Sequence, residues 1–249
     1  LPHFDPHDPG LSPERAYATY AQLRRHCPVS HGERHGGYWS ISRYADVRDA
    51  ATDHTTYSST GGVYLPPVSG SRFPPIDHDP PEHAGFRELI APLTSGAAAK
   101  TMEPAVRAIA ERLVDGFTGR GRAELAAELA TPLPLEVITR LYDLGPEDTE
   151  EIRGYSEEFL THASGSRGPE IIDRVCRYWV GLFADRRENP REDFLTGLVE
   201  ANRELGATDD ELANMMFILT YAGHDSTALG LGNTLLYLAE HPDVQQRLL

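Results

Sequence analysis

The sequence predicts a mainly α-helical protein with a small β-sheet near its N-terminus. Strand-like alternation is confined to the first 81 residues, which hold 11 of the 19 prolines. After residue 82, apolar residues recur at spacings of three and four, as on one face of a helix. With 249 residues, 40% of them hydrophobic, we expect a single domain with a loop- and strand-rich part (1–81) and a helical part (82–249).

The charge balance excludes several kinds of partner. Lys and Arg number 23 against 38 Asp and Glu, a net charge of −15, which repels phosphate backbones and anionic lipid. No uninterrupted apolar run approaches the roughly 18 residues of a membrane span. Two cysteines cannot form a disulfide framework. We therefore expect a cytoplasmic protein that binds neither nucleic acid nor membrane.

The N-terminal part contains the strand signals. Residues 38–41 alternate after Gly36-Gly37, and residues 28–30 supply a possible partner strand. Residues 43–52 have the pattern of a short helix, whereas residues 57–79 have no regular pattern and predict a long loop.

The helical part begins where Glu82 follows two prolines. One apolar stripe runs from Met102 to Phe117, and another lies within residues 171–183 and ends before Pro190. Residues 125–142 predict two helical pieces or one that bends.

The last helix is the most informative. Thr208 and Glu211 have the spacing of a capping box, and nothing ends the helix before His241-Pro242. Some 32 residues span about 48 Å. Because the segment is apolar on nearly every side, we expect it to run through the centre of the fold.

A small and polar run, Ala222 to Thr227, interrupts this helix. Gly223 costs roughly 1 kcal/mol relative to alanine, and the Ser226 hydroxyl can donate to the carbonyl four residues back, which bends helices. We expect a local opening where a small molecule reaches the backbone, with Asp225 and two hydroxyls beside it. Alternatively, Asp225 and Ser226 satisfy each other and a neighbouring helix.

A second pair, His83 and Arg87, lies four residues apart on one helix face. Two such donors can bind a pair of carboxylates, with the arginine supplying a planar fork. The alternative is an ordinary solvated helix face.

Together these motifs resemble the N-terminal part of a soluble bacterial cytochrome P450, a haem-thiolate monooxygenase, through its long oxygen-binding helix. Supporting segments are Cys27-Pro28-Val29, Gly37-Tyr38-Trp39, Ser42–Val47, Tyr57-Ser58-Ser59, Pro80–His83 with Arg87, Pro132–Ile138, and Ala222–Thr227 followed by His241-Pro242.

The resemblance implies haem b as cofactor and assigns roles to residues. His83 and Arg87 would hold the haem propionates, and Ala222 and Gly223 would leave room for dioxygen. Asp225 would relay protons, with Ser226 and Thr227 as the hydroxyls beside it. By position in the family, candidates for the substrate pocket are Val63, Tyr64, Phe73, Phe159 and Ile218. The alternative is that these side chains pack onto the core.

The sequence departs from the family pattern in four places. Serine stands at position 226 where threonine is usual, and Gly85 and Glu88 stand where relatives commonly carry arginines. Neither Cys27 nor Cys176 fits the family's Phe-x-x-Gly-x-x-x-Cys-x-Gly loop, and no Glu-x-x-Arg pair follows the long helix. We therefore expect no metal ligand in this chain, an iron-binding cysteine beyond Leu249, and a fold incomplete at its C-terminus.

The resemblance implies oxidation of a small organic substrate by dioxygen, with electrons from a ferredoxin-type donor. A helper protein of the same fold, which has lost the iron ligand and activates a partner enzyme, is the alternative. Intact motifs at residues 222–227 and at His83 and Arg87 favour the enzyme.

Overall fold

A computed structural model describes residues 4–66, 72–162 and 167–248. The chain divides into two compact units. Unit 1 comprises residues 1–71 and 76–82, and unit 2 comprises residues 72–75 and 83–249. The boundary near residue 82 lies where the sequence changes from strand-rich to helical. The prediction of a single domain stays a prediction.

Unit 1 contains the sheet. Its elements are α1 (Pro13–His26), β1 (Val29–Gly32), a 3-10 turn (Arg34–Gly36), β2 (Tyr38–Ile41) and α2 (Tyr44–Thr52). The strands are antiparallel, with Val29 opposite Ile41 and Gly32 opposite Tyr38. The turn between them depends on Gly36 and Gly37, whose φ angles are 87° and 91°, in the region that favours glycine. The predicted hairpin and short helix are confirmed.

Helix α1 was not predicted, although its start is encoded locally. The Ser12 side chain accepts from the Arg15 amide, and Pro13 occupies the first helical turn. Before the helix, the buried Asp5 accepts hydrogen bonds from Arg34 (2.8 Å) and His35 (2.9 Å). The His35 bond, the His7 amide and Arg34 hold the pKa of Asp5 well below its usual range. This pair connects the N-terminal segment to the turn between the strands.

Unit 2 is helical throughout the residues that the structure describes, as the sequence predicted. Its elements are α3 (Glu82–Thr94), α4 (Gly96–Thr118), a π-helical segment (Ala126–Ala130), α5 (Pro132–Leu141), α6 (Pro146–His162), α7 (Gly168–Glu188), α8 (Phe194–Leu205), α9 (Asp209–Glu240) and α10 (Pro242–Gln246). The π-helical segment followed by α5 is the two-piece arrangement expected for residues 125–142.

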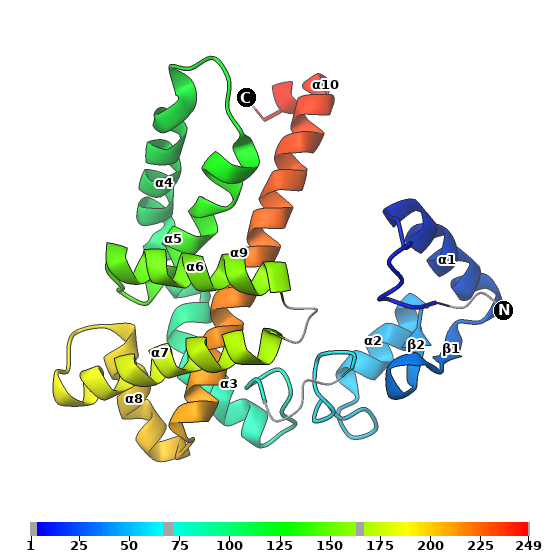
Figure 1. The fold of residues 1–249 in the computed structure, drawn as a ribbon, viewed down its shortest axis with the longest axis horizontal. Coiled ribbons are helices and arrows are strands. Elements are labelled where there is room, and N and C mark those ends of the chain that lie inside the picture. The colour runs from blue at the N-terminus through cyan, green and yellow to red at the C-terminus, as the bar shows by residue number, and fades with distance from the viewer. Residues whose placement is uncertain (1–3, 67–71, 163–166, 249) are drawn as a thin grey trace. The chain divides into compact units, whose positions relative to one another are not determined.

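Helix α9 is the longest element, and it runs across α6 and α7 (Figure 1). Thr208 and Glu211 form the predicted capping box. The N-terminal half of α9 is the core of unit 2: Leu212, Met215 and Phe217 are fully buried against α5 and α7.

The expectation that α9 runs through the centre of the fold holds for its N-terminal half only. Beyond His224 the helix turns apolar side chains to the surface, with Leu229 61% and Leu236 58% exposed. Apolar composition requires that a face be covered, but it does not identify the segment that covers it. The other side of this half is half-buried and contacts the π-helical segment and α10.

Helices α7 and α8 are joined by a buried ion pair. Arg186 Nε donates to Asp193 Oδ2 over 2.5 Å, with both side chains almost inaccessible. Asp193 also accepts from the Thr196 amide and thereby caps α8.

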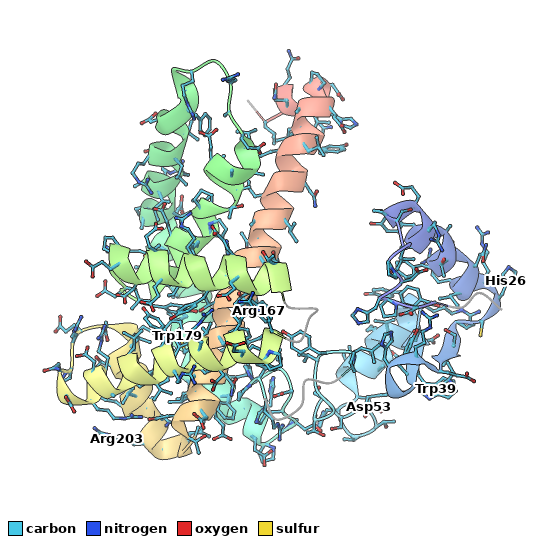
Figure 2. All side chains as sticks on the ribbon, in the orientation of Figure 1. His26, Trp39, Asp53, Arg167, Trp179 and Arg203 are labelled. Carbon is cyan, nitrogen blue, oxygen red and sulfur yellow. The ribbon has the colours of Figure 1, made fainter. Side chains whose placement is uncertain are left out.

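The two tryptophans differ in their surroundings: Trp179 of α7 is fully buried, whereas Trp39 of β2 is 70% exposed (Figure 2).

Within the described residues, the helices are too short or too polar to span a bilayer.

Candidate functional site

The first part of the site lies on α3. Phe86, Leu89 and Ile90 anchor this helix in the core, while His83 is half-buried and Arg87 exposed. Neither His83 nor Arg87 forms a hydrogen bond or an ion pair with any residue of the described chain. The buried arginine of unit 2, Arg186, is paired with Asp193. His83 and Arg87, in contrast, have no partner in the described chain and are available to an external anion.

Gly85 faces the opposite way from the donors. A Cβ at position 85 would lie 2.5 Å from Leu205 Cδ1 of α8. The position therefore packs against α8, and a longer side chain there would require the Leu205 side chain to move.

The second part of the site lies on α9 at residues 222–227. Ser226 donates to the Ala222 carbonyl over 2.7 Å, as predicted. Both residues are exposed and, being four apart, share one face. The helix is nevertheless continuous from Asp209 to Glu240, so the site is an exposed face of small residues and not a break in the helix.

Gly223 was expected to leave room for dioxygen, but the structure gives it a different role. A Cβ at this position would lie 2.6 Å from Ile138 Cδ1 of α5. Ile138 is itself buried, so its side chain has little freedom to move. The missing side chain at position 223 allows α9 and α5 to approach closely, and the open side of the helix is the one that carries Ala222.

Asp225 is half-buried, and within the described chain it has neither an ion pair nor a hydrogen bond. The alternative in which Asp225 and Ser226 satisfy each other is therefore wrong. Thr227 is exposed, and its hydroxyl is likewise unpaired among described residues. A carboxylate without a fixed partner can change its orientation and its protonation state, as a proton relay requires.

His224 was not identified as a candidate from the sequence. Its side chain is 3% exposed, and neither ring nitrogen has a hydrogen bond of good geometry to a described residue, although the Thr131 backbone lies close enough to act on the ring. Burial lowers the pKa of His224, and the Thr131 backbone and the Asp225 carboxylate partly oppose this shift. An apolar residue would fill such a position without burying polar ring atoms. The sequence carries no signal for this, because the burial of the ring depends on contacts with other helices.

Two of the expected pocket residues are core residues. Phe73 and Phe159 pack against Phe217, with ring centroids 5.8 and 5.2 Å apart, and both are buried. Ile218 is half-buried on α9. Val63 and Tyr64 lie in unit 1, with Val63 45% exposed.

The two cysteines have local partners. Cys27 Sγ donates to the Val29 carbonyl and Cys176 Sγ to Asn214 Oδ1. Burial, reinforced by nearby carboxylates, raises the pKa of Cys176 to about 12. Since a metal takes the thiolate, a raised pKa makes this side chain a poor ligand.

Comparison with known proteins agrees with this geometry. The cytochrome P450 family model matches residues 153–249. Cyclomarin C epoxidase CymV of Salinispora arenicola is 31% identical over 89% of this chain, and β-dihydromenaquinone-9 ω-hydroxylase of Mycobacterium bovis is 32% identical over 98%. The solved structure of cytochrome P450mel 107F1 covers 96% of the chain with a TM-score of 0.80 and 28% identity.

The fold and these matches therefore define a cytochrome P450-like protein. More specifically, the chain matches the N-terminal portion of bacterial cytochrome P450s, through α9. The chain spans 59% of the length of the epoxidase, 51% of the hydroxylase and 62% of the P450mel chain.

The close approach at Gly223 gives a first prediction. In Gly223→Ala, the overlap with Ile138 costs about 1–3 kcal/mol, which exceeds the roughly 1 kcal/mol gained in helix propensity. We expect a net fall of about 1 kcal/mol in the free energy of unfolding, measured by denaturant titration.

Two variants make this test specific. Gly230 lies on the same helix with no atom near its Cβ position, so Gly230→Ala should gain up to about 1 kcal/mol. Ile138→Val removes the overlapping atom and should turn the effect of Gly223→Ala into a gain. A loss in Gly223→Ala that persists in the valine background would contradict the packing role.

Proposed function

We propose that this chain is part of a haem-dependent monooxygenase that uses dioxygen to oxidise a small organic substrate. The observation that carries the proposal is Asp225, an unpaired, half-buried carboxylate beside exposed hydroxyls on a face of small residues. The printed names of similar proteins describe an epoxidase, a hydroxylase and an N-oxygenase, which are oxidations of this class.

The residues of α3 fit a haem. His83 and Arg87 are two donors without partners among the described residues, and the carboxylates of haem b would provide acceptors for both. Charge-assisted bonds of this kind contribute about 1.5–3 kcal/mol each. His83 and Arg87 would thus hold the cofactor, which when bound supplies the iron centre for oxygen activation.

The residues of α9 would manage protons. Asp225 can accept a proton from solvent and pass it towards the exposed face, because no ion pair fixes its charge. Ser226 already donates its proton to the Ala222 carbonyl, so in this rotamer its oxygen is an acceptor. The Thr227 hydroxyl, unlike that of Ser226, donates no hydrogen bond to a backbone carbonyl in the described chain. It is therefore free to donate to a ligand, which supports a shared role for Ser226 and Thr227.

We also propose a ferredoxin-type electron donor. The chain carries a net charge of −15, and Glu88 on α3 is exposed. An acidic donor would therefore meet repulsion over most of the surface. Arg87 is a cation on that helix which no described residue neutralises.

The direct test is spectroscopic. In the full-length protein, reduction under carbon monoxide should produce the absorption band characteristic of a haem-thiolate. An iron-free protein that instead stimulates a partner enzyme would support the helper function and overturn the proposal.

A second prediction concerns the cofactor. Replacing both His83 and Arg87 by alanine should weaken haem retention about tenfold or more, measured as the haem-to-protein ratio after gel filtration. Arg107→Ala is the matched control, because Arg107 forms only an exposed pair with Glu103 on α4. Equal haem content in the double variant and the control would remove the pair from the cofactor site.

A third prediction concerns Asp225. Asp225→Asn preserves shape but cannot relay protons, so product formation should fall about 100-fold while the substrate dissociation constant stays within about twofold. Asp210→Asn makes the same chemical change in the exposed first turn of α9 and should not affect the rate. An unchanged product rate in Asp225→Asn would exclude Asp225 from the proton path.

A further inference from the structure

Unsatisfied polar atoms gather where α9 packs against α6 and the start of α5. His224 is buried, and its ring nitrogens have no hydrogen bond of good geometry among the described residues, although the Thr131 backbone acts on the ring. Ser156 Oγ of α6 is buried without a hydrogen-bond partner in the described chain, and Arg153 Nε has only a 3.3 Å ion pair with Glu150. Tyr221, one turn before His224, donates to the Tyr155 and Ser156 carbonyls (3.0 and 3.2 Å). These bonds attach α9 to α6 beside His224.

An imidazole is a costly choice at this place. Each unsatisfied buried donor or acceptor costs about 1–3 kcal/mol, whereas a phenyl ring of similar size would cost nothing of this kind. Packing alone therefore does not account for a histidine, and its ability to gain a proton distinguishes it from the apolar alternatives.

The surroundings of His224 are mixed in charge. Among the described residues, the groups that act on the ring are the Thr131 backbone at the start of α5, Arg153 and Glu157 on α6, and Asp225 on α9 itself. Arg153 is within 3.3 Å of Glu150, whereas Asp225 has no ion pair. Asp225 is thus the neighbouring carboxylate most free to respond to a charge on His224.

We infer that His224 is a positioning residue for Asp225: the neutral ring leaves the carboxylate free to serve the exposed face of α9, and the imidazolium draws it away. The inference deepens the proposed function, on which it rests, by tying the proton relay to the charge state of its buried neighbour.

The direction of the effect follows from the environment. Burial keeps the imidazole neutral at and above its ordinary pKa of 6.5. As the pH falls below that value, the ring takes up a proton from solvent and attracts the Asp225 carboxylate. Electrons would then be delivered to oxygen without a properly placed proton donor. Less product would therefore form per reducing equivalent consumed.

The first experiment measures that coupling in the haem-loaded full-length protein. Product formed per reducing equivalent consumed is compared at about pH 8 and at about one pH unit below the wild-type His224 midpoint that the NMR titration below gives, and each variant is normalised to its own value at the higher pH. The wild type should lose at least about threefold, whereas His224→Phe and His224→Gln should lose less than about 1.5-fold.

The two substitutions separate packing from titration. Phenylalanine keeps the ring volume and glutamine keeps a polar side chain, but neither titrates. His241→Phe is the matched control, since His241 caps the exposed end of the same helix and bonds to the Tyr237 carbonyl. His241→Phe should show the same fall in product per reducing equivalent at the lower pH as the wild type. An equally large fall in both His224 variants would overturn the inference.

A second measurement needs no turnover. Ring chemical shifts of His224, assigned by their absence in His224→Gln, are followed against pH by NMR. The midpoint should lie below 6.5 in the wild type and fall by at least about 0.5 pH unit in Asp225→Asn, where the stabilising negative charge is gone, but not in Asp210→Asn.

An identical midpoint in the wild type and Asp225→Asn would refute the coupling between the two residues. The titration also separates the two proposals. The His224 midpoint could depend on Asp225 in a protein that oxidises no substrate. That result would contradict the proposed function but support the electrostatic coupling.

Discussion

The close approach of α9 to α5 at Gly223 fixes the rotation of α9 about its own axis. Ile138 occupies the space that a side chain at position 223 would need, so one side of the helix must face α5. Helical geometry then assigns the other positions, since neighbouring residues differ by about 100°. His224 is directed into the interior, and Ala222 and Ser226 are left on the open side.

Rotation of α9 also separates two kinds of polar group. On the open side, hydroxyls and a carboxylate have solvent or a ligand within reach. On the inner side, the side chains of His224 and Ser156 are buried without a hydrogen bond of good geometry among the described residues. Half-buried Asp225 lies between these environments and directly follows the buried His224 in the chain.

The sequence predicted the features that depend on local chemistry. The capping box at Thr208 and the stop before Pro242 located α9, and the Ser226 hydroxyl bond follows from its spacing. Features that depend on contacts between distant segments were missed or misjudged. Gly223 was read as space for a ligand because Ile138 lies 85 residues earlier in the sequence, and an unsatisfied imidazole at position 224 has no signature in a linear pattern.

The two tryptophans have an optical consequence. Trp179 is enclosed in unit 2 beside Tyr142 and Tyr178, whereas Trp39 lies on the surface of unit 1. A buried indole emits at shorter wavelength than a hydrated one, and added quenchers reach it more slowly. The chain thus carries one tryptophan in each unit, and with excitation that selects tryptophan over tyrosine the two differ in emission wavelength and in access to quenchers.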